Sequence, residues 1–351
     1  MTIQHPSKPI VLIHLAASVQ GRAVVRAALA RGFRVRALVR DRARANALPS
    51  GPVEWVEADL DDSEALRGAS AGVGHAVLQV PTGPADTMAA QAARAATALV
   101  DAGLRSIVLK LASASRPTQC AEPSLVGNAR VEDAVRRAGL ACVTVRPTMY
   151  LDNLLKPSAR REIIEDGVFS PPIAASKRIA WTSVDDCARA AVELLECSGT
   201  GDYRIAGPQS LDGDELAAFI SAGLGRPVAY RAQAIDVFER EVDATMGAGM
   251  GKRIGSKFRY FEAHPEEADS ILSRPYTPQS GLEEFKPTDV QTWIRLHQRD
   301  FLCDGEPQQP IAAVMTAPSA HKQVQEGGNT ESQKRRLDAV VRERDRYRSR
   351  D

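Results

Sequence analysis

The chain has 351 residues, of which 44% are hydrophobic and 25% are charged, and its formal net charge is +1. This length suits one large α/β domain with additions, or two domains. The near-neutral charge gives no electrostatic basis for binding nucleic acid or an anionic membrane. We see no apolar run near the roughly 20 residues of a membrane helix and no signal-peptide core before the first strand. The five cysteines and six histidines are scattered, so we expect no metal site, no disulfide framework and a cytoplasmic setting.

Strand and helix patterns alternate along the first part of the chain. Apolar runs predict strands, and the amphipathic stretches between them predict helices. The expected strands are 10–13, 33–39, 53–58, 74–80, 106–111 and 141–146. The expected helices are 22–31, one that begins at Asp62 or Ser63, 86–102 and 126–138. Strands that alternate with helices of this length indicate βαβ crossovers, and therefore a parallel sheet with helices on both faces.

After Pro147 the pattern loosens into shorter pieces. They predict strands at 181–184, 201–206 and 227–231, and helices at 211–224, 235–246, 265–272 and 288–301. Another helix is expected to begin at Asp185 or Asp186 and to end near residue 196. The predicted fold class is α/β: a Rossmann-like, doubly wound parallel sheet with a small C-terminal α+β lobe. The expected domains are 1–155, the Rossmann NAD(P)-binding-like domain; 156–303, a substrate-binding lobe interleaved with it; and 304–351, a disordered charged tail.

The turn between the first strand and the first helix has the position of a dinucleotide-binding loop. Such a loop carries three glycines, and the matching positions here hold Leu15, Ser18 and Gly21. Gly21 allows close packing of helix on strand, and Ser18 can offer a hydroxyl to a phosphate. Leu15 disfavours the positive φ that a glycine adopts freely. Two interpretations stay open: an unusual dinucleotide site that works, or a retained Rossmann scaffold with an empty or altered pocket.

Five residues at the ends of later strands are candidate cofactor contacts. Arg40 follows the second strand, where an arginine pairs with the 2′-phosphate of NADP, so we expect NADP(H) as the cofactor; a basic helix start is the alternative. Asp59 and Leu60 follow the third strand and suit the adenine, although a helix cap explains the acidic residue equally well. Gln79 and Pro81 end the fourth strand, where they would lie beneath the middle of a dinucleotide. The alternative is that they only terminate the strand.

Candidate catalytic residues follow the fifth and sixth strands. Carbonyl reduction on this fold uses a Tyr and a Lys four residues apart, with a Ser, and the sequence contains no Y-x-x-x-K. Ser113 can take the serine position, and Asn128 stands where the lysine is expected, either as a catalytic residue or as a polar residue at a helix start. Tyr150 is the candidate proton donor. Candidate substrate contacts are Met149, Tyr150, Asn153 and Met246, the last in a glycine-rich mobile flap or surface loop at 246–251.

Together these residues resemble the NmrA-like group of atypical short-chain dehydrogenases/reductases over about 10–301. The resemblance is carried by the pairs Gly21-Arg22, Arg146-Pro147 and Asn153-Leu154 and by segments 35–41, 57–60, 184–189 and 201–208. It implies a Rossmann domain that binds NAD(P) and a small lobe that frames the substrate cleft. It also implies either a reductase of quinones or phenolic compounds, or a redox-sensing regulator that binds a dinucleotide without turnover.

We therefore expect an NAD(P)-dependent reductase of a small cyclic or aromatic metabolite, with NADPH over Ser18, Gly21 and Arg40. Tyr150 or a bound water would supply the proton. Two alternatives stay open: an isomerase, dehydratase or cyclase without nicotinamide, and a non-catalytic regulator that senses a dinucleotide. The expected partner is a small molecule rather than nucleic acid or a membrane, and a homodimer is left open.

Overall fold

The computed structural model describes residues 9–43, 51–115, 122–197 and 199–302. Within these ranges, seven parallel strands form one sheet in the order β3-β2-β1-β4-β5-β6-β8. Their bounds are β1 (Ile10–Ile13), β2 (Arg34–Val39), β3 (Val53–Glu57), β4 (His75–Leu78), β5 (Ser106–Lys110), β6 (Val143–Pro147) and β8 (Gly201–Ile205). The strand order reverses between β1 and β4, which is where open α/β sheets bind ligands. The predicted Rossmann-like, doubly wound fold is confirmed.

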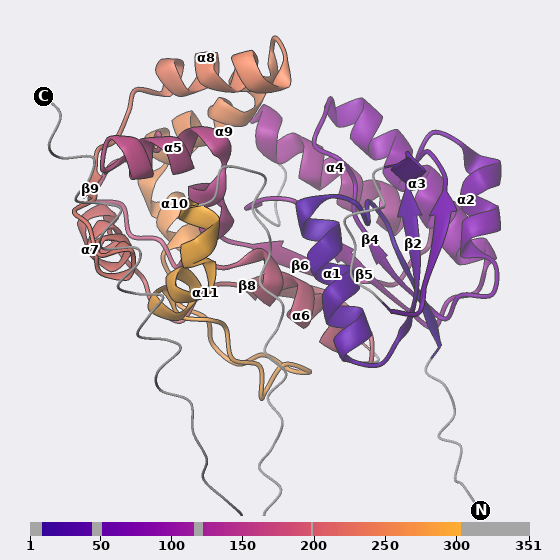
Figure 1. The fold of residues 1–351 in the computed structure, drawn as a ribbon. Helices are drawn as coiled ribbons and strands as arrows, with labels where there is room; N and C mark the ends of the chain where they lie inside the picture. The colour runs from indigo at the N-terminus through magenta and orange to yellow at the C-terminus, as the bar shows by residue number, and fades with distance from the viewer. Residues whose placement is uncertain (1–8, 44–50, 116–121, 198, 303–351) are drawn as a thin grey trace, which may run out of the picture. The chain divides into compact units, whose positions relative to one another are not determined.

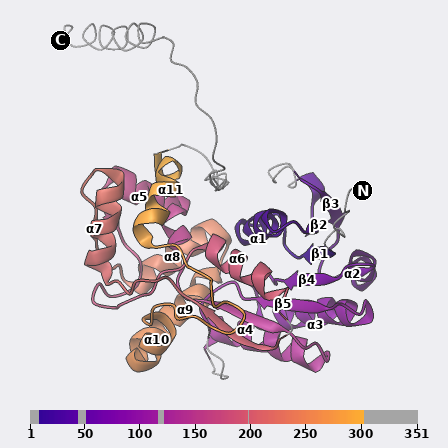
Figure 2. The same cartoon turned by 90° about the horizontal axis from the view of Figure 1, so that it is seen from below.

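Helices cover both faces of the sheet (Figures 1 and 2). One face packs against α1 (Val19–Ala30) and α6 (Val184–Leu194). The other packs against α2 (Ser63–Ser70), α3 (Ala85–Asp101) and α4 (Pro123–Arg137). Side chains alternate between these cores along each strand: in β1, Val11 and Ile13 face α1, and Leu12 faces the opposite core. Apolar residues on both faces are typical of parallel strands buried on both sides.

The residues after β6 build most of a second, smaller lobe. It holds the 3₁₀ helix η2 (Leu151–Leu155) and a two-stranded parallel sheet of β7 (Val168–Phe169) and β9 (Ala229–Tyr230). Its other helices are α5 (Pro157–Glu165), α7 (Gly213–Leu224), α8 (Ile235–Met246), α9 (Met250–Ala263), α10 (Pro265–Leu272) and α11 (Val290–Leu302). This lobe has its own apolar core around Leu216, Phe258 and Trp293. The chain returns from the lobe to place β8 beside β6 in the main sheet.

Two helices begin at serine caps that the sequence analysis assigned differently. Helix α1 begins at Val19 rather than at residue 22, because the hydroxyl of Ser18 accepts the N–H of Gly21 at 2.9 Å. Helix α6 is capped by Ser183, not by either of the two aspartates that follow it. The predicted strand at 181–184 is also wrong, because Thr182 makes only an isolated parallel bridge with Tyr150.

The glycine-rich stretch predicted as a flap or surface loop is a short turn that runs directly into a helix. Gly247 and Gly249 adopt positive φ in the turn between α8 and α9, but α9 begins directly afterwards at Met250. A Cβ on Gly251 would lie 2.0 Å from the carbonyl oxygen of Glu239. This glycine therefore permits the close packing of two helices rather than the motion of a loop.

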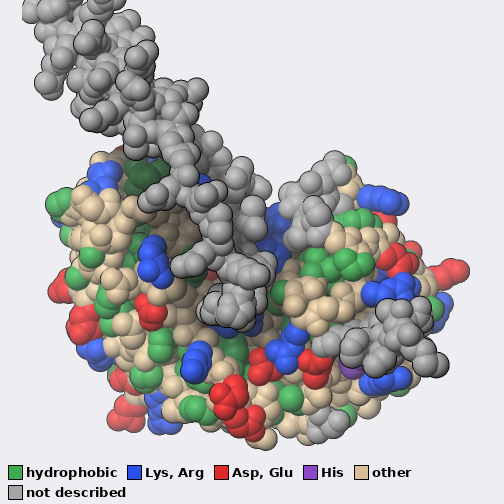
Figure 3. All heavy atoms as spheres, turned by 60° about the horizontal axis from the view of Figure 1, so that its bottom comes forward, with side chains coloured by type: hydrophobic (Ala, Val, Ile, Leu, Met, Phe, Trp, Pro, Cys, Tyr) green, Lys and Arg blue, Asp and Glu red, His purple; other side chains and the backbone are tan. Residues whose placement is uncertain are grey.

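Basic and acidic side chains are interspersed on the face shown in Figure 3, as the near-neutral net charge leads one to expect. In the described ranges no helix is both long enough and apolar enough to cross a membrane. The tail predicted at 304–351 lies outside the described residues.

Candidate functional site

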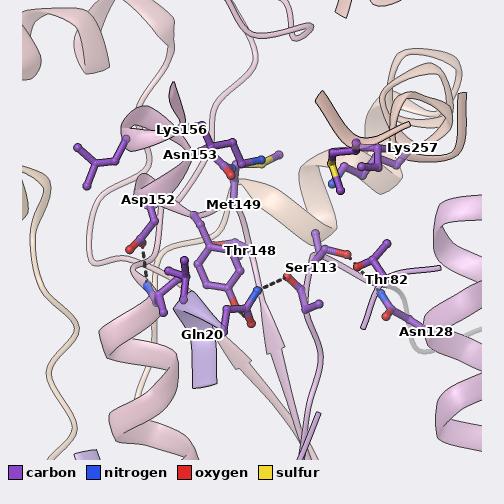
Figure 4. Close-up of a pocket in the computed structure, with 18 of the residues that line it drawn as sticks. Gln20, Thr82, Ser113, Asn128, Thr148, Met149, Asp152, Asn153, Lys156 and Lys257 are labelled. Atoms are coloured by element: carbon purple, nitrogen blue, oxygen red, sulfur yellow. Dashed lines mark hydrogen bonds between the residues drawn. The ribbon is translucent and has the colours of Figure 1, made fainter. Parts of the chain in front are cut away.

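A pocket of about 680 Å³ lies where the carboxyl ends of β5 and β6 meet the start of α1 and the smaller lobe. Its walls come from α1, α4, α8 and α9 and from the segments that follow β4, β5 and β6 (Figure 4). This volume is typical of a small-molecule site. In the part of the chain that the structure describes, no group of His, Cys, Asp and Glu side chains could hold a metal ion.

The four predicted substrate contacts all line this pocket. Met149, Tyr150 and Asn153 follow β6, and Met246 reaches the pocket from the end of α8. Tyr150 is 7% exposed. The structure thus brings these residues to one pocket, and their contact with a substrate stays a prediction.

Ser113 and Asn128 also meet at the pocket. The amide of Asn128, which is 4% exposed, donates to the hydroxyl of Ser113 at 3.4 Å. Both side chains line the cavity. Because an amide carries no dissociable proton of useful acidity, Asn128 can orient a polar group but cannot replace a lysine ammonium.

A lysine that the sequence analysis did not select lies buried behind the pocket wall, in contact with two residues of that wall. Lys110 is the last residue of β5 and is 1% exposed. Its ammonium donates to the side-chain oxygen Oε1 of Gln20 and to the phenolic oxygen of Tyr150, the latter at 3.2 Å. The amide nitrogen of Gln20 donates to the carbonyl of Ala112 at 3.0 Å, which turns Oε1 toward the ammonium. Three segments are thereby joined: the start of α1, the end of β5 and the turn after β6.

Burial determines the protonation states in this cluster. It lowers the pKa of Lys110 to about 8 and raises the pKa of Tyr150 well above its usual range. The neighbouring thiol of Cys187 also has its pKa raised by burial, to about 11. At neutral pH the cluster therefore holds a protonated phenol, a neutral thiol and a lysine that is mostly an ammonium.

The sequence does carry a signal for Lys110. It stands in the apolar run 107–111, where Val108 and Lys110 point to the same face of the sheet. A lysine is almost never fully buried unless its charge has a partner. A lone lysine in such a strand is therefore a candidate functional residue.

The turn between β1 and α1 lacks two of the usual glycines but holds Leu15 in a backbone conformation that favours glycine. Leu15 has φ 52°, the left-handed conformation that a glycine would adopt at this position. A Cβ on Gly21 would lie 2.0 Å from the carbonyl oxygen of Leu15, so the last glycine is required by close approach. In the described ranges, the first amides of α1, at Val19 and Gln20, donate to no protein acceptor, and the hydroxyl of Ser18 lies beside them. These groups fit a phosphate at a helix N-terminus.

The other predicted cofactor contacts lie outside the pocket wall. Arg40, Asp59 and Pro81 are exposed near strand ends. Leu60 is 4% exposed and packs in the core beneath α2 and α3. Their roles as cofactor contacts stay predictions.

Gln79 has a structural contact that the sequence analysis did not anticipate. Its side chain is buried, and its amide donates to the carbonyl of His14 at 3.0 Å. The bond ties the end of β4 to the end of β1, directly beneath the turn. Gln79 therefore supports the turn from below.

Comparisons with known proteins give the family of the chain. The family model described as the NmrA-like family matches residues 7–294. An NAD(P)H azoreductase from Xenophilus azovorans is 31% identical over 243 residues, which cover 68% of this chain and 81% of that protein. A (4-alkanoyl-5-oxo-2,5-dihydrofuran-3-yl)methyl phosphate reductase from Streptomyces griseus is 31% identical over 237 residues, which cover 65% of this chain and 78% of that protein.

Among solved structures, the NADPH-dependent quinone oxidoreductase QOR2 from Escherichia coli, in complex with NADPH, matches with a TM-score of 0.64. The match is 20% identical and covers 81% of this chain and 98% of that chain, so it shows the shared fold. With the family match over most of the chain and the resemblance predicted from its motifs, the chain belongs to the NmrA-like family.

Proposed function

We propose that this protein is an NADPH-dependent reductase of a small cyclic or aromatic compound. The observation that carries the proposal is the hydrogen bond between the buried ammonium of Lys110 and the phenol of Tyr150, at the wall of a pocket beside the dinucleotide-binding turn. Both similar curated proteins are named as reductases, one of them NAD(P)H-dependent, which supports the same class of reaction.

The residues of the turn fit the diphosphate of a dinucleotide. The free N–H groups of Val19 and Gln20 and the hydroxyl of Ser18 would hold it at the positive end of the α1 dipole. Arg40, exposed after β2, would pair with a 2′-phosphate, and this favours NADPH over NADH. When bound, the cofactor supplies a hydride to the acceptor.

Tyr150 and Lys110 supply the proton. The O–H bond of Tyr150 breaks, and its proton passes to the oxygen or nitrogen atom of the substrate that gains negative charge. The phenolate left behind is stabilised by the charge-assisted hydrogen bond from Lys110, and a proton from solvent later restores the phenol. Lys110 thus does from β5 what a lysine four residues after the tyrosine does in the usual arrangement.

The remaining wall residues position the substrate. Ser113 and Asn128 present polar groups on the side formed by β5 and α4. Met149 and Met246 present flexible, polarizable side chains that adapt to flat ring systems. Because most of the surface of the pocket wall is apolar, the pocket suits a mainly apolar acceptor that carries some polar atoms.

The test is NADPH oxidation in the presence of naphthoquinone or hydroxyazobenzene as acceptor. We expect turnover by the native protein, and a fall in kcat of about 100-fold in Tyr150→Phe, the range expected for loss of a general acid. Tyr203→Phe, on β8 and away from the pocket wall, is the matched control and should keep native activity. NADPH binding without oxidation by any carbonyl, quinone or azo acceptor would instead support a regulator, and would overturn the proposal.

A further inference from the structure

Two helices of the smaller lobe direct positive charge into the same end of the pocket. Lys156, just before α5, and Arg160 stand at positions i and i+4, and so do Arg253 and Lys257 on α9. All four line the cavity. Residues four apart share one helix face, so each pair places two positive charges at the cavity, and Lys156 is in addition exposed to solvent.

The described residues of the pocket wall carry little negative charge to balance these four cations. Among the described residues that line it, Asp152 is the one carboxyl. It accepts the N–H of Val184 at 2.9 Å, and burial raises its pKa to about 6. The carboxyl group of Asp152 is therefore already hydrogen-bonded to the first residue of α6.

The two arginines donate to backbone carbonyls, whereas Lys257 contacts only the face of the Phe258 ring, 5.1 Å from its centroid, among the described residues. Arg160 donates to the carbonyl of Asp300 at 3.2 Å, and Arg253 donates to the carbonyl of Gly83 at 3.1 Å. Within the described ranges, the ammonium groups of Lys156 and Lys257 make neither a hydrogen bond to protein nor an ion pair. Two strongly hydrated cations therefore face a partly enclosed cavity without a counterion.

These lysines interact unfavourably with each other. Burial lowers the pKa of Lys257 to about 8, and the positive charge of Lys156 contributes to this shift. Figure 4 shows the two lysines on facing sides of one end of the pocket, with Gln20 of α1 at the opposite end. A bound anion would relieve the repulsion and supply the missing hydrogen-bond acceptors.

We propose that Lys156 and Lys257 form an anion-binding subsite that holds a carboxylate, sulfonate or phosphate group of the substrate. The rest of the substrate extends past Met149 toward Tyr150. The substrate class is thus a cyclic or aromatic compound with an anionic substituent. That this compound is reduced near Tyr150 rests on the proposed reductase function. The subsite serves the substrate rather than the cofactor, because both lysines belong to the smaller lobe and lie at the end of the pocket away from α1.

The test is a pair of fluorescent probes with one ring system. Anilinonaphthalene sulfonate carries an anionic group, and phenylnaphthylamine lacks it. We expect Lys156→Gln and Lys257→Gln each to raise the Kd of the sulfonate by about tenfold, the loss expected for one charge-assisted hydrogen bond. The Kd of the neutral probe should change by less than about twofold, a difference within side-chain packing effects. Lys252→Gln, an exposed lysine of α9 off the pocket wall, is the matched control and should leave both values unchanged.

Three results would overturn the subsite. The first is an unchanged Kd for the sulfonate in the double variant Lys156→Gln/Lys257→Gln. The second is an equal loss of affinity for both probes, which would show that the lysine side chains act by packing. The third is a raised Kd for NADPH in either variant, which would assign the lysines to the cofactor. Lys257→Arg keeps the positive charge and should keep the affinity for the sulfonate. Retained affinity in this variant would show that the glutamine variant loses affinity because it lacks the charge, and not because a substitution at this position disrupts the fold.

Neither probe is reduced, and the titration contains no NADPH, so the binding result stands whether or not the protein is a reductase. Turnover provides the second arm. Hydroxyazobenzene and its sulfonate are compared with native protein and with Lys257→Gln, and the ratio of their kcat/KM values should fall about tenfold in the variant. Absence of turnover with both dyes would count against the reductase alone, and an unchanged ratio would count against the subsite alone.

Discussion

The ammonium of Lys110 lies 3.2 Å from the phenolic oxygen of Tyr150, although the two residues belong to different segments of the chain. Lys110 ends β5, and Tyr150 follows β6, which pairs with β5 in parallel register. Because neighbouring parallel strands end at the same edge of a sheet, the two side chains meet there. A Tyr–Lys pair is thus present in a chain that has no Y-x-x-x-K motif.

The first prediction concerns the pH dependence of reduction. Burial lowers the pKa of Lys110 to about 8, and the ammonium is the form that stabilises a phenolate. Activity should therefore be constant below pH 8 and fall as pH rises above it. In Lys110→Arg the fall should move to higher pH, because a guanidinium keeps its proton. In Lys110→Met, kcat should drop by about 10- to 100-fold at neutral pH.

The measurement is kcat against pH for the three proteins with one neutral quinone. The Kd of NADPH serves as the control and should be the same in all three. If Lys110→Met kept the native alkaline decline, the titrating group would be another residue and the assignment would be wrong.

The second prediction concerns the turn. Leu15 already holds φ 52°, so Leu15→Gly should change the Kd of NADPH by less than about tenfold, the factor that corresponds to the roughly 1–2 kcal/mol cost of a left-handed residue. In Gly21→Ala, the new Cβ would lie 2.0 Å from the carbonyl oxygen of Leu15 and would displace the turn. Its Kd should rise by more than about tenfold. Titrations of both variants by nicotinamide fluorescence make the comparison, and binding that appears only in Leu15→Gly would show that the natural turn is disabled.

Sequence patterns were sufficient for the sheet, because each βαβ unit is specified by residues close together in the chain. The apolar runs and Gly21 predicted the strand–turn–helix start, and α8 and α10 have the bounds that their patterns predicted. The errors have physical causes. Gly247 and Gly249 do lie in a turn, but Gly251 was interpreted as part of the same loop, whereas it lies in α9 and is needed for the contact between α8 and α9.

The site was less predictable than the fold. Met149, Tyr150 and Asn153 could be proposed because they follow a parallel strand, and Ser113 because it follows the neighbouring one. Lys110 was missed although a lone lysine in an apolar strand is unusual. Lys156 and Lys257 were missed because each is ordinary in its local sequence. The importance of Lys156 and Lys257 arises only when the start of α5 and the helix α9 converge on one cavity, and such convergence of distant segments has no local pattern.

The third prediction concerns stability. Arg146 is 6% exposed and donates to Glu132 and Ser115, each at 2.8 Å, and so joins β6 to α4. Arg146→Met takes from the buried carboxylate of Glu132 its hydrogen-bonded cation and leaves it the exposed Arg136 at 3.9 Å, so the free energy of unfolding should fall by about 3–5 kcal/mol. Adding Glu132→Met should restore much of that loss, because the pair is then replaced by apolar side chains. Urea denaturation of the two variants and the native protein is the measurement; a double variant no more stable than the single one would contradict the explanation.

The central claim is that a turn with two missing glycines still holds NADPH beside Tyr150. It is tested most directly by titrating the unmodified protein with NADPH and NADH and following nicotinamide fluorescence. The account predicts a Kd for NADPH on the order of micromolar, about −8 kcal/mol of binding free energy, and weaker binding of NADH. No detectable binding of NADPH at millimolar concentration would contradict it and would favour chemistry without nicotinamide in the same pocket.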